Sequence, residues 1–143
     1  MVLSHLLYIS DATHPMSRAQ LEAIRETSVR NNIHLDITGV LFYSAGHFVQ
    51  LLEGDMSTIH RMFEKIAADA RHENVKLLVL RPAEKRVFEQ WEMGLLDMDQ
   101  QSKARQRDLV ELVRLAEAAD STSFGTPVEM EILSKFCMLL PAV

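Results

Sequence analysis

Apolar and polar residues follow two rhythms along the first hundred positions, one typical of strands and one typical of helices. Strand segments alternate residue by residue, because successive side chains point to opposite faces of a sheet, and helical segments repeat apolar residues every three or four positions. In chain order, the pattern predicts a strand over residues 2–10, a helix over about 18–31, a hairpin over 36–43 and 47–53, a helix after residue 55, and strands over 75–80 and 91–96. The order βαββαββ favours a ferredoxin-like α+β fold, in which a mixed sheet carries both helices on one face.

Local signals support several of these boundaries. Ser17 is a candidate N-cap for the first helix. One face of that helix is shared, at spacings of three and four, by Leu21, Ile24, Ser28 and Asn32. A turn that contains glycine joins the two hairpin strands. The strand over 75–80 is short and apolar enough to be buried, and Pro82 would end it.

The pattern changes after Met98, and we divide the chain there into a domain over residues 1–98 and a helical tail over residues 99–143. An apolar stripe at helical spacing runs from Leu109 to Ala116, and residues 128–139 predict a last, rather apolar helix after a loop. A tail of this length is too short to form a core of its own. We therefore expect it to pack on the uncovered face of the sheet, on a second subunit, or on both.

Gln50 is the most informative single residue of the chain. It lies in the middle of a predicted buried strand, and the alternation that turns Phe48 and Leu52 inward turns Gln50 inward with them. A buried amide costs free energy unless both its donor and its acceptor find partners. The position of Gln50 therefore indicates either a ligand or a bond to the backbone.

Four further residues are expected near Gln50, namely Tyr8 on the first strand, Asn32 at the end of the first helix, and Trp91 and Met93 on one face of the last strand. A flat apolar cavity lined by a few amides and a phenol suits a planar aromatic cofactor. Each residue also has an ordinary structural interpretation: Tyr, Trp and Met as core packing, Asn as a helix C-cap. No single one of them specifies a function.

Composition and charge exclude several classes of protein. The chain has 143 residues, 48% of them hydrophobic and 24% charged, which predicts one globular domain. Its net charge of −5 and the lack of a basic stripe argue against nucleic-acid binding. The single cysteine, Cys137, excludes an intrachain disulfide and a cysteine-based zinc site. We find no signal peptide and no membrane-spanning apolar run, so we expect a cytoplasmic protein without membrane contact.

Catalytic motifs are not found in the sequence. The six histidines lack a metal-ligand spacing with a carboxylate, and there is no nucleophile elbow, P-loop or dinucleotide fingerprint. Asp69, Arg71 and His72 are polar enough to hold a ligand, although a solvated helix C-terminus would have the same composition. We expect no enzymatic activity in this chain by itself.

Six motifs in order resemble the BLUF family of flavin-dependent blue-light sensors, over roughly residues 3–97. They are Tyr8-Ile-Ser, Asn31-Asn32, Ile37-Thr38-Gly39, Gly46-His-Phe-Val-Gln50-Leu-Leu-Glu-Gly54, Asp69-Ala-Arg71-His72, and Arg86-Val-Phe88-Glu-Gln-Trp91-Glu-Met93. The remainder is similar to the short helical tail of stand-alone members, which carry no fused effector domain. The resemblance implies a flavin between the two helices, with FAD expected and FMN or riboflavin as alternatives.

The resemblance also assigns roles to residues. Tyr8 would be the photochemical electron donor, Gln50 the amide that rearranges, and Trp91 and Met93 the residues that carry the signal toward the tail. Lys65 would meet a phosphate as a point charge. The residues expected to bind the flavin are Ile24, Ser28, Asn31, Asn32, Gln50, Lys65, Ile66, Asp69, Arg71 and His72.

The resemblance therefore implies a photoreceptor whose tail changes either a homo-oligomer, a dimer or higher, or the binding of a separate downstream protein. A ferredoxin-like ligand-binding or regulatory subunit without a photocycle is the main alternative. A small acylphosphatase-type hydrolase on the same fold is a weaker one, because no Arg/Asn phosphate cradle precedes the first helix.

Overall fold

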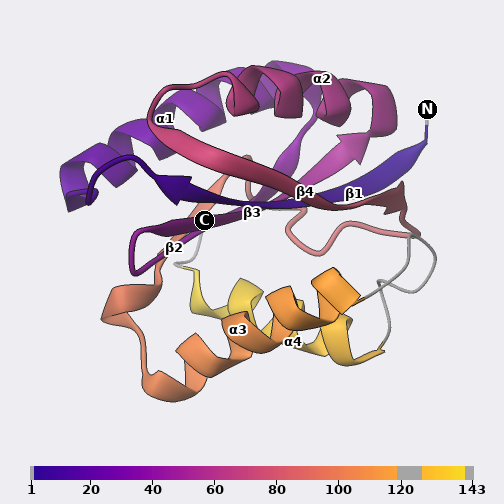
Figure 1. Ribbon diagram of the computed structural model, residues 1–143. Helices are drawn as coiled ribbons and strands as arrows, with labels where there is room; N and C mark the ends of the chain where they lie inside the picture. The colour runs from indigo at the N-terminus through magenta and orange to yellow at the C-terminus, as the bar shows by residue number, and fades with distance from the viewer. Residues whose placement is uncertain (1, 119–126, 141–143) are drawn as a thin grey trace.

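The computed structural model describes residues 2–118 and 127–140, which form a five-stranded sheet between two layers of helices (Figure 1). Helices α1 and α2 cover one face of the sheet, and α3 and α4 cover the other. In chain order the elements are β1 Leu3–Ala12, α1 Arg18–Leu35, β2 Thr38–Ser44, β3 His47–Asp55, α2 Met56–Ala67, β4 His72–Pro82, β5 Gly94–Asp97, the 3₁₀ turn η1 Met98–Gln100, α3 Lys103–Ala118 and α4 Pro127–Leu139.

The sheet has the strand order β4-β1-β3-β2-β5, in which β5 pairs parallel to β2 and every other pair is antiparallel. This arrangement confirms the predicted ferredoxin-like fold with an added fifth strand and a helical tail. Strand β3 lies in the centre, hydrogen-bonded to β1 on one side and β2 on the other.

A two-residue turn sets the register of the hairpin. Ala45 and Gly46 both have positive φ angles, of 48° and 81°, which match the right-handed twist of the flanking strands. The pairing that follows puts Gln50 opposite Leu41 of β2 and opposite Tyr8 of β1. The turn and the β1 register together bring the phenol and the amide to one place.

Helix α1 begins as predicted and ends later. Ser17 is its N-cap, in a reciprocal capping box with Gln20. The helix continues to Leu35, four residues beyond the predicted end, and Asp36 closes it in the left-handed conformation with a φ of 54°. The interpretation of Asn32 as a C-cap is therefore wrong, because Asn32 lies inside the helix and is buried.

The last two strands differ from their predicted boundaries. Strand β4 is longer than the predicted 75–80 and mostly not buried, because it is an edge of the sheet with a hydrogen-bonded neighbour on one side only. Strand β5 spans only Gly94–Asp97, not 91–96. The residues before it make their hydrogen bonds outside a strand ladder, for instance from the amide of Gly39 to the carbonyl of Trp91 at 2.9 Å.

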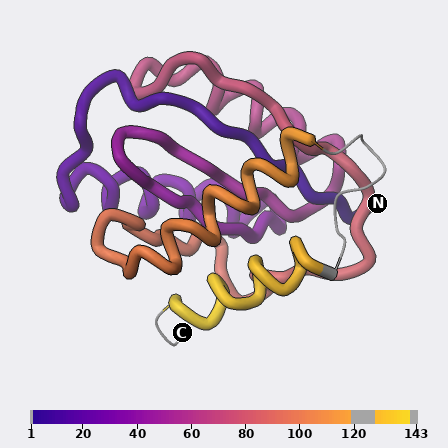
Figure 2. Tube along the Cα trace, turned by 60° about the horizontal axis from the view of Figure 1, so that its bottom comes forward, coloured from indigo at the N-terminus to yellow at the C-terminus, as the bar shows by residue number. Residues whose placement is uncertain are grey.

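The tail completes a second core on the face of the sheet opposite α1 and α2, and α3 and α4 contact each other there (Figure 2). The ring of Phe136 on α4 meets the ring of Phe42 on β2 edge to face, with centroids 4.8 Å apart. Packing on the uncovered sheet face is thus confirmed, whereas a contact with a second subunit stays a prediction. The predicted loop over 121–127 lies largely outside the described residues.

Replacing Phe136 by alanine tests this second core. Phe136 is fully buried, so Phe136→Ala should lower the free energy of unfolding by about 3 kcal/mol or more, through lost burial and the cavity left behind. Met138 lies on the same helix and is 86% exposed, so Met138→Ala should change it by less than about 0.5 kcal/mol. Chemical denaturation of both variants measures the difference, and equal effects would contradict the packing of α4 on the sheet.

Candidate functional site

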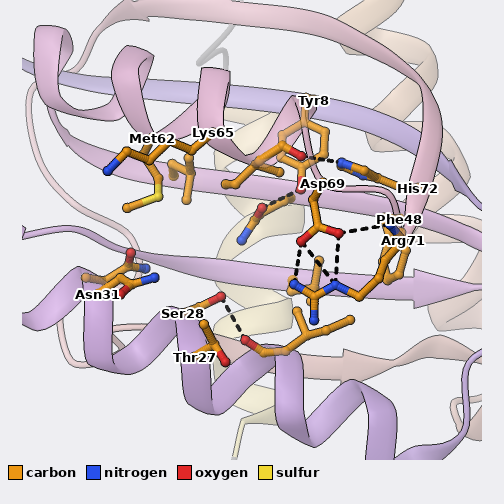
Figure 3. Close-up of a pocket in the computed structure, with 16 residues that line it drawn as sticks. Tyr8, Thr27, Ser28, Asn31, Phe48, Met62, Lys65, Asp69, Arg71 and His72 are labelled. Atoms are coloured by element: carbon orange, nitrogen blue, oxygen red, sulfur yellow. Dashed lines mark hydrogen bonds and ion pairs between the residues drawn. The ribbon is translucent and has the colours of Figure 1, made fainter.

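A cavity of about 240 Å³ lies between the sheet and the two helices α1 and α2. In Figure 3 the labelled side chains of α1 lie on one side of it and those of α2 on the other, with Asp69, Arg71 and His72 together at one end. All ten residues predicted to bind a cofactor line this cavity, as does Tyr8: Ile24, Ser28, Asn31, Asn32, Gln50, Lys65, Ile66, Asp69, Arg71 and His72. The cavity lies in the space between sheet and helices where the sequence predicted a site for a planar cofactor.

A chain of three hydrogen-bonded side chains begins at the cavity with Tyr8 and Gln50 and ends at Met93, which lies behind them in the core. The hydroxyl of Tyr8 donates to Oε1 of Gln50 at 2.5 Å, and Nε2 of Gln50 donates to the sulfur of Met93 at 3.3 Å. All three side chains are buried, with Gln50 only 4% exposed. The amide thus satisfies its acceptor with a strong hydroxyl donor and its donor with a thioether, which is a weak acceptor.

Burial keeps the Tyr8 phenol neutral. Loss of hydration raises the pKa of Tyr8 well above its ordinary value, and the negative charge of Asp69 raises it further. The ring of Phe63 lies 5.5 Å from the Tyr8 ring, so the phenol is enclosed by apolar groups as well. The proton of Tyr8 therefore stays on the oxygen and points at Gln50.

Asn32 connects the cavity wall to the chain that precedes β5. Its Nδ2 donates to the backbone carbonyl of Glu92 at 2.7 Å. Ile24, Ser28 and Asn32 all line the cavity from one side of α1, which confirms the predicted shared face. Asn31 lines it as well, from a more exposed position.

An ion pair stands at one end of the cavity. The guanidinium of Arg71 donates two hydrogen bonds to the carboxylate of Asp69, from Nε to Oδ1 at 3.0 Å and from Nη2 to Oδ2 at 2.5 Å. The hydrogen bonds from Arg71 hold the pKa of Asp69 below its ordinary value, so the pair is charged at neutral pH. Both residues follow the end of α2 at Ala67 and line the cavity where it is open to solvent, with side chains 33% exposed for Asp69 and 48% exposed for Arg71.

His72 uses both ring nitrogens within the protein. The Ile66 carbonyl, 2.5 Å from Nε2, can only accept, so Nε2 carries a proton. In the neutral ring, Nδ1 accepts from the hydroxyl of Ser10 at 2.8 Å. A ligand would therefore meet His72 through the face or a carbon edge of its ring.

Trp91 and Met93 do not share a face. Met93 belongs to the core under α1 and α2, whereas Trp91 packs against the core under α3 and α4. The prediction placed both on one strand, and it was wrong because neither residue lies in β5. Of the two, only Met93 contacts Gln50 by a hydrogen bond.

Five residues that line the cavity were not predicted as binding residues: Thr27, Leu41, Phe48, Leu52 and Met62. The inward parity of β3 already pointed to Phe48 and Leu52, and Met62 is a buried residue of α2. Thr27 lies three residues after Ile24 and four before Asn31 on α1, so the spacing of three and four could have indicated it.

The described residues were also searched for metal sites and for membrane-spanning helices. Among residues 2–118 and 127–140, no three His, Cys, Asp or Glu side chains are grouped so that they could hold a metal ion. No helix in the same part of the chain is both long enough and apolar enough to span a bilayer.

Comparison with known families identifies the family of the chain. Residues 3–94 match the family model of BLUF, described as sensors of blue-light using FAD. The chain belongs to the BLUF family. The match covers β1 through the start of β5 and therefore every residue that lines the cavity.

Individual BLUF proteins agree with this assignment. The chain is 44% identical over 86 residues to the photoactivated adenylate cyclase subunit beta of Euglena longa, which is 60% of this chain and 10% of that protein. It therefore spans about a tenth of the length of the curated relatives it matches, and this likeness assigns no cyclase activity to it.

Solved BLUF structures extend the likeness to the tail. The dark-state structure of BlrB, a BLUF protein, has a TM-score of 0.73 at 28% identity and covers 97% of this chain and 98% of its own. BlrP1 of Klebsiella pneumoniae, solved with FMN and cyclic diGMP, has a TM-score of 0.70 at 28% identity over 95% of this chain and 34% of its own.

The neutral state of Tyr8 gives a prediction at alkaline pH. The unfolded chain releases the tyrosine proton near pH 10, whereas the folded chain retains it, so the stability from the neutral phenol is present below about pH 10 and lost as the pH rises toward the folded pKa. Between about pH 9 and pH 11, wild-type protein should lose more stability than Tyr8→Phe, by about 1.4 kcal/mol for each pH unit above 10.

Chemical denaturation at each pH measures this difference. Tyr43→Phe, which removes the other tyrosine of the chain, is the matched comparison. If Tyr8→Phe and wild type lost stability in parallel, the phenol would not be held neutral by the fold.

Proposed function

We propose that this chain senses blue light through an oxidised flavin bound in the cavity between α1 and α2, and that Tyr8 and Gln50 are its photochemical residues. The observation that carries the proposal is the line of hydrogen bonds that runs from Tyr8 and Gln50, which line the cavity, to Met93 behind them. Membership in the BLUF family supports the cofactor, and the roles of individual residues rest on the geometry.

The residues around the cavity fit a flavin. Apolar side chains from the sheet and both helices, such as Ile24, Leu41 and Ile66, form walls that suit a flat tricyclic ring. Amide groups of Asn31, Asn32 and Gln50 offer donors and acceptors for its polar edge. Arg71, Lys65 and the partly exposed end of the cavity suit a polar chain with phosphates.

A bound flavin would supply an oxidant that is activated by blue light. Tyr8 can donate an electron to this oxidant, and its proton can move along the 2.5 Å hydrogen bond to Oε1 of Gln50. When the electron and the proton return to Tyr8, the charges are restored, but the amide of Gln50 can stay in a changed arrangement. The lasting product is then a different hydrogen-bond pattern around Gln50, and not a chemical change of the cofactor.

The output is proposed to leave through the chain before β5 and through the tail. Met93 bonds to Gln50, and β5 leads directly into η1 and α3. Residues 1–98 would then act as the sensor and residues 99–143 as the output and assembly segment. The proposed readers of the change are a second copy in a homo-oligomer or a separate downstream protein.

Two substitutions test the photochemistry. Tyr8→Phe removes the donor and Gln50→Leu removes the amide, so both variants should retain flavin absorption but lose the small red shift that wild type shows after blue light. The measurement is the visible spectrum before and after illumination. Tyr43→Phe is the control, because the Tyr43 hydroxyl accepts from the amide of Met16 and does not line the cavity, and it should keep the red shift.

The outcomes separate the alternatives. A red shift that survives in Tyr8→Phe or Gln50→Leu would reject the proposed residues. Wild-type protein that takes up flavin without any shift would be a ligand-binding module without a photocycle.

The choice of flavin gives a second test. FAD is the proposed cofactor, with FMN or riboflavin as alternatives, and Lys65 is the proposed phosphate contact. Lys65→Gln should weaken FAD binding roughly fivefold, the effect of one exposed charge pair, and leave riboflavin binding unchanged, because riboflavin has no phosphate.

Fluorescence titration of the flavin-free protein with each flavin measures both affinities. Arg61→Gln is the matched control, since Arg61 is an exposed cation on α2 that does not line the cavity. Equal losses of affinity for FAD and riboflavin would show that Lys65 does not meet a phosphate.

A further inference from the structure

A buried carboxylate lies on the opposite face of the sheet from the cavity. Glu53 follows Gln50 by three residues on β3, so its side chain points to the other side, and it is 0% exposed. It accepts four hydrogen bonds. The donors are Nε2 of His5 at 3.0 Å and the amide of Val87 at 2.6 Å on Oε2, and the hydroxyl of Thr38 at 3.0 Å and the amide of Phe88 at 2.8 Å on Oε1.

The arrangement requires an ionised carboxylate. Burial by itself would raise the pKa of Glu53, but the hydrogen bonds from His5, Val87 and Phe88 outweigh burial and hold the pKa below its ordinary value. Each oxygen receives one backbone amide, and a backbone amide can only donate. A glutamine at this position would therefore set its own NH₂ group against one of these amides.

Arg86 strengthens the same attachment from outside. Its Nη1 donates to the Thr38 hydroxyl at 2.9 Å and to the backbone carbonyl of Glu53 at 3.1 Å, and its Nη2 donates to the carbonyl of Asp36 at 2.8 Å. Because the Thr38 hydroxyl accepts from Arg86, its own proton is directed to Glu53. Residues 86–88 are thereby attached to β2 and β3 by side chains instead of a strand ladder.

The attached segment reaches α4 on one face. The carbonyl of Val87 accepts from Sγ of Cys137 at 3.5 Å, and Phe88 is fully buried in the core that α3 and α4 complete.

The same segment reaches the cavity on the other face. Five residues after Phe88, the chain meets Gln50 through Met93, having passed the Asn32 contact at Glu92. The Gln50 side chain and α4 are thus joined by one short stretch of backbone.

We propose that Glu53 is a positioning residue of the sensor, which holds residues 86–88 so that a rearrangement at Gln50 and Met93 moves α4 instead of being absorbed in the loop. The proposal rests on the proposed photochemistry for its light-dependent part. Without the four hydrogen bonds to Glu53, residues 86–88 could move independently of β2 and β3, and a shift of Met93 would be absorbed between Phe88 and Met93. With them, Met93 can shift only together with the peptide that contacts Cys137.

Cys137 is the only cysteine of the chain and reports on the attachment directly. The experiment uses the full, flavin-loaded chain and measures the rate of Cys137 alkylation by iodoacetamide in darkness and under blue light, together with the rate at which the red shift decays in darkness. The variants are Glu53→Gln and the milder Thr38→Val, which removes one donor and keeps the shape. Glu84→Gln is the control, an exposed acid shortly before residue 86 that is not among the charges acting on the Cys137 thiol.

We expect light to change the alkylation rate in wild type and in Glu84→Gln. Thr38→Val and Glu53→Gln should be alkylated roughly tenfold faster in darkness, the effect expected for loss of one hydrogen bond to a charged group. Their light-to-dark ratio should approach one, and their red shift should keep its size but decay faster, because Glu53 does not line the cavity.

The proposal is overturned if folded, flavin-loaded Thr38→Val behaves like wild type in alkylation and in decay of the red shift, and this variant decides alone if Glu53→Gln does not fold. It is also overturned if wild type shifts to the red while light leaves the Cys137 rate unchanged. A wild type without a red shift would reject the proposed function instead. The attachment of residues 86–88 would then be tested by the alkylation rates in darkness alone, and equal rates in wild type and Thr38→Val would overturn it.

Discussion

The antiparallel pairing of β3 with β1 is the constraint on which the site depends. It sets Gln50 directly opposite Tyr8, and the central position of β3 leaves neither residue room to move along the sheet. Because side chains alternate across a strand, the same strand presents Gln50 to the cavity and Glu53 to the opposite core. A shift of the register by one residue would exchange these two faces, so that Gln50 would turn away from the cavity and Glu53 would turn toward the face that carries it. The two-residue turn at Ala45-Gly46 fixes the other side of β3 against β2 and prevents such a shift.

Much of this could be predicted from the sequence, because the signals involved are local. Ser17 predicted the start of α1, and the turn that contains glycine predicted the hairpin of β2 and β3. The parity of Phe48, Gln50 and Leu52 predicted which way the amide points. The spacing of Ile24, Ser28 and Asn32 gave the lining face of α1. The cavity then follows from the fold. Short, right-handed connections place both helices on one face of the sheet, so the lining face of α1, the apolar side of α2 and the inward side of β3 meet there.

The segment between β4 and β5 could not be predicted, and the reason is physical. Its backbone groups are satisfied by partners far away in the sequence, the Glu53 carboxylate, the Asn32 side chain and the amide of Gly39. Alternation in residues 91–96 therefore suggested a strand ladder that the chain does not make, and Trp91 was assigned to the face of Met93. A charged residue inside an apolar strand, as Glu53 is, was the signal available for this attachment. Its meaning depends on the donors, and those are visible only in the structure.

The unequal partners of Gln50 suggest how one amide can have two stable arrangements. Its acceptor holds a strong bond from Tyr8, whereas its donor meets the sulfur of Met93, which is a weak acceptor. Exchanging the weak bond for another partner costs little, while burial makes any arrangement without partners expensive. Such a network has few states, each well separated from the others, and this is the property that a switch needs. The buried carboxylate behind the same strand has the opposite character, with four donors and no weak one, so it holds residues 86–88 in a single arrangement.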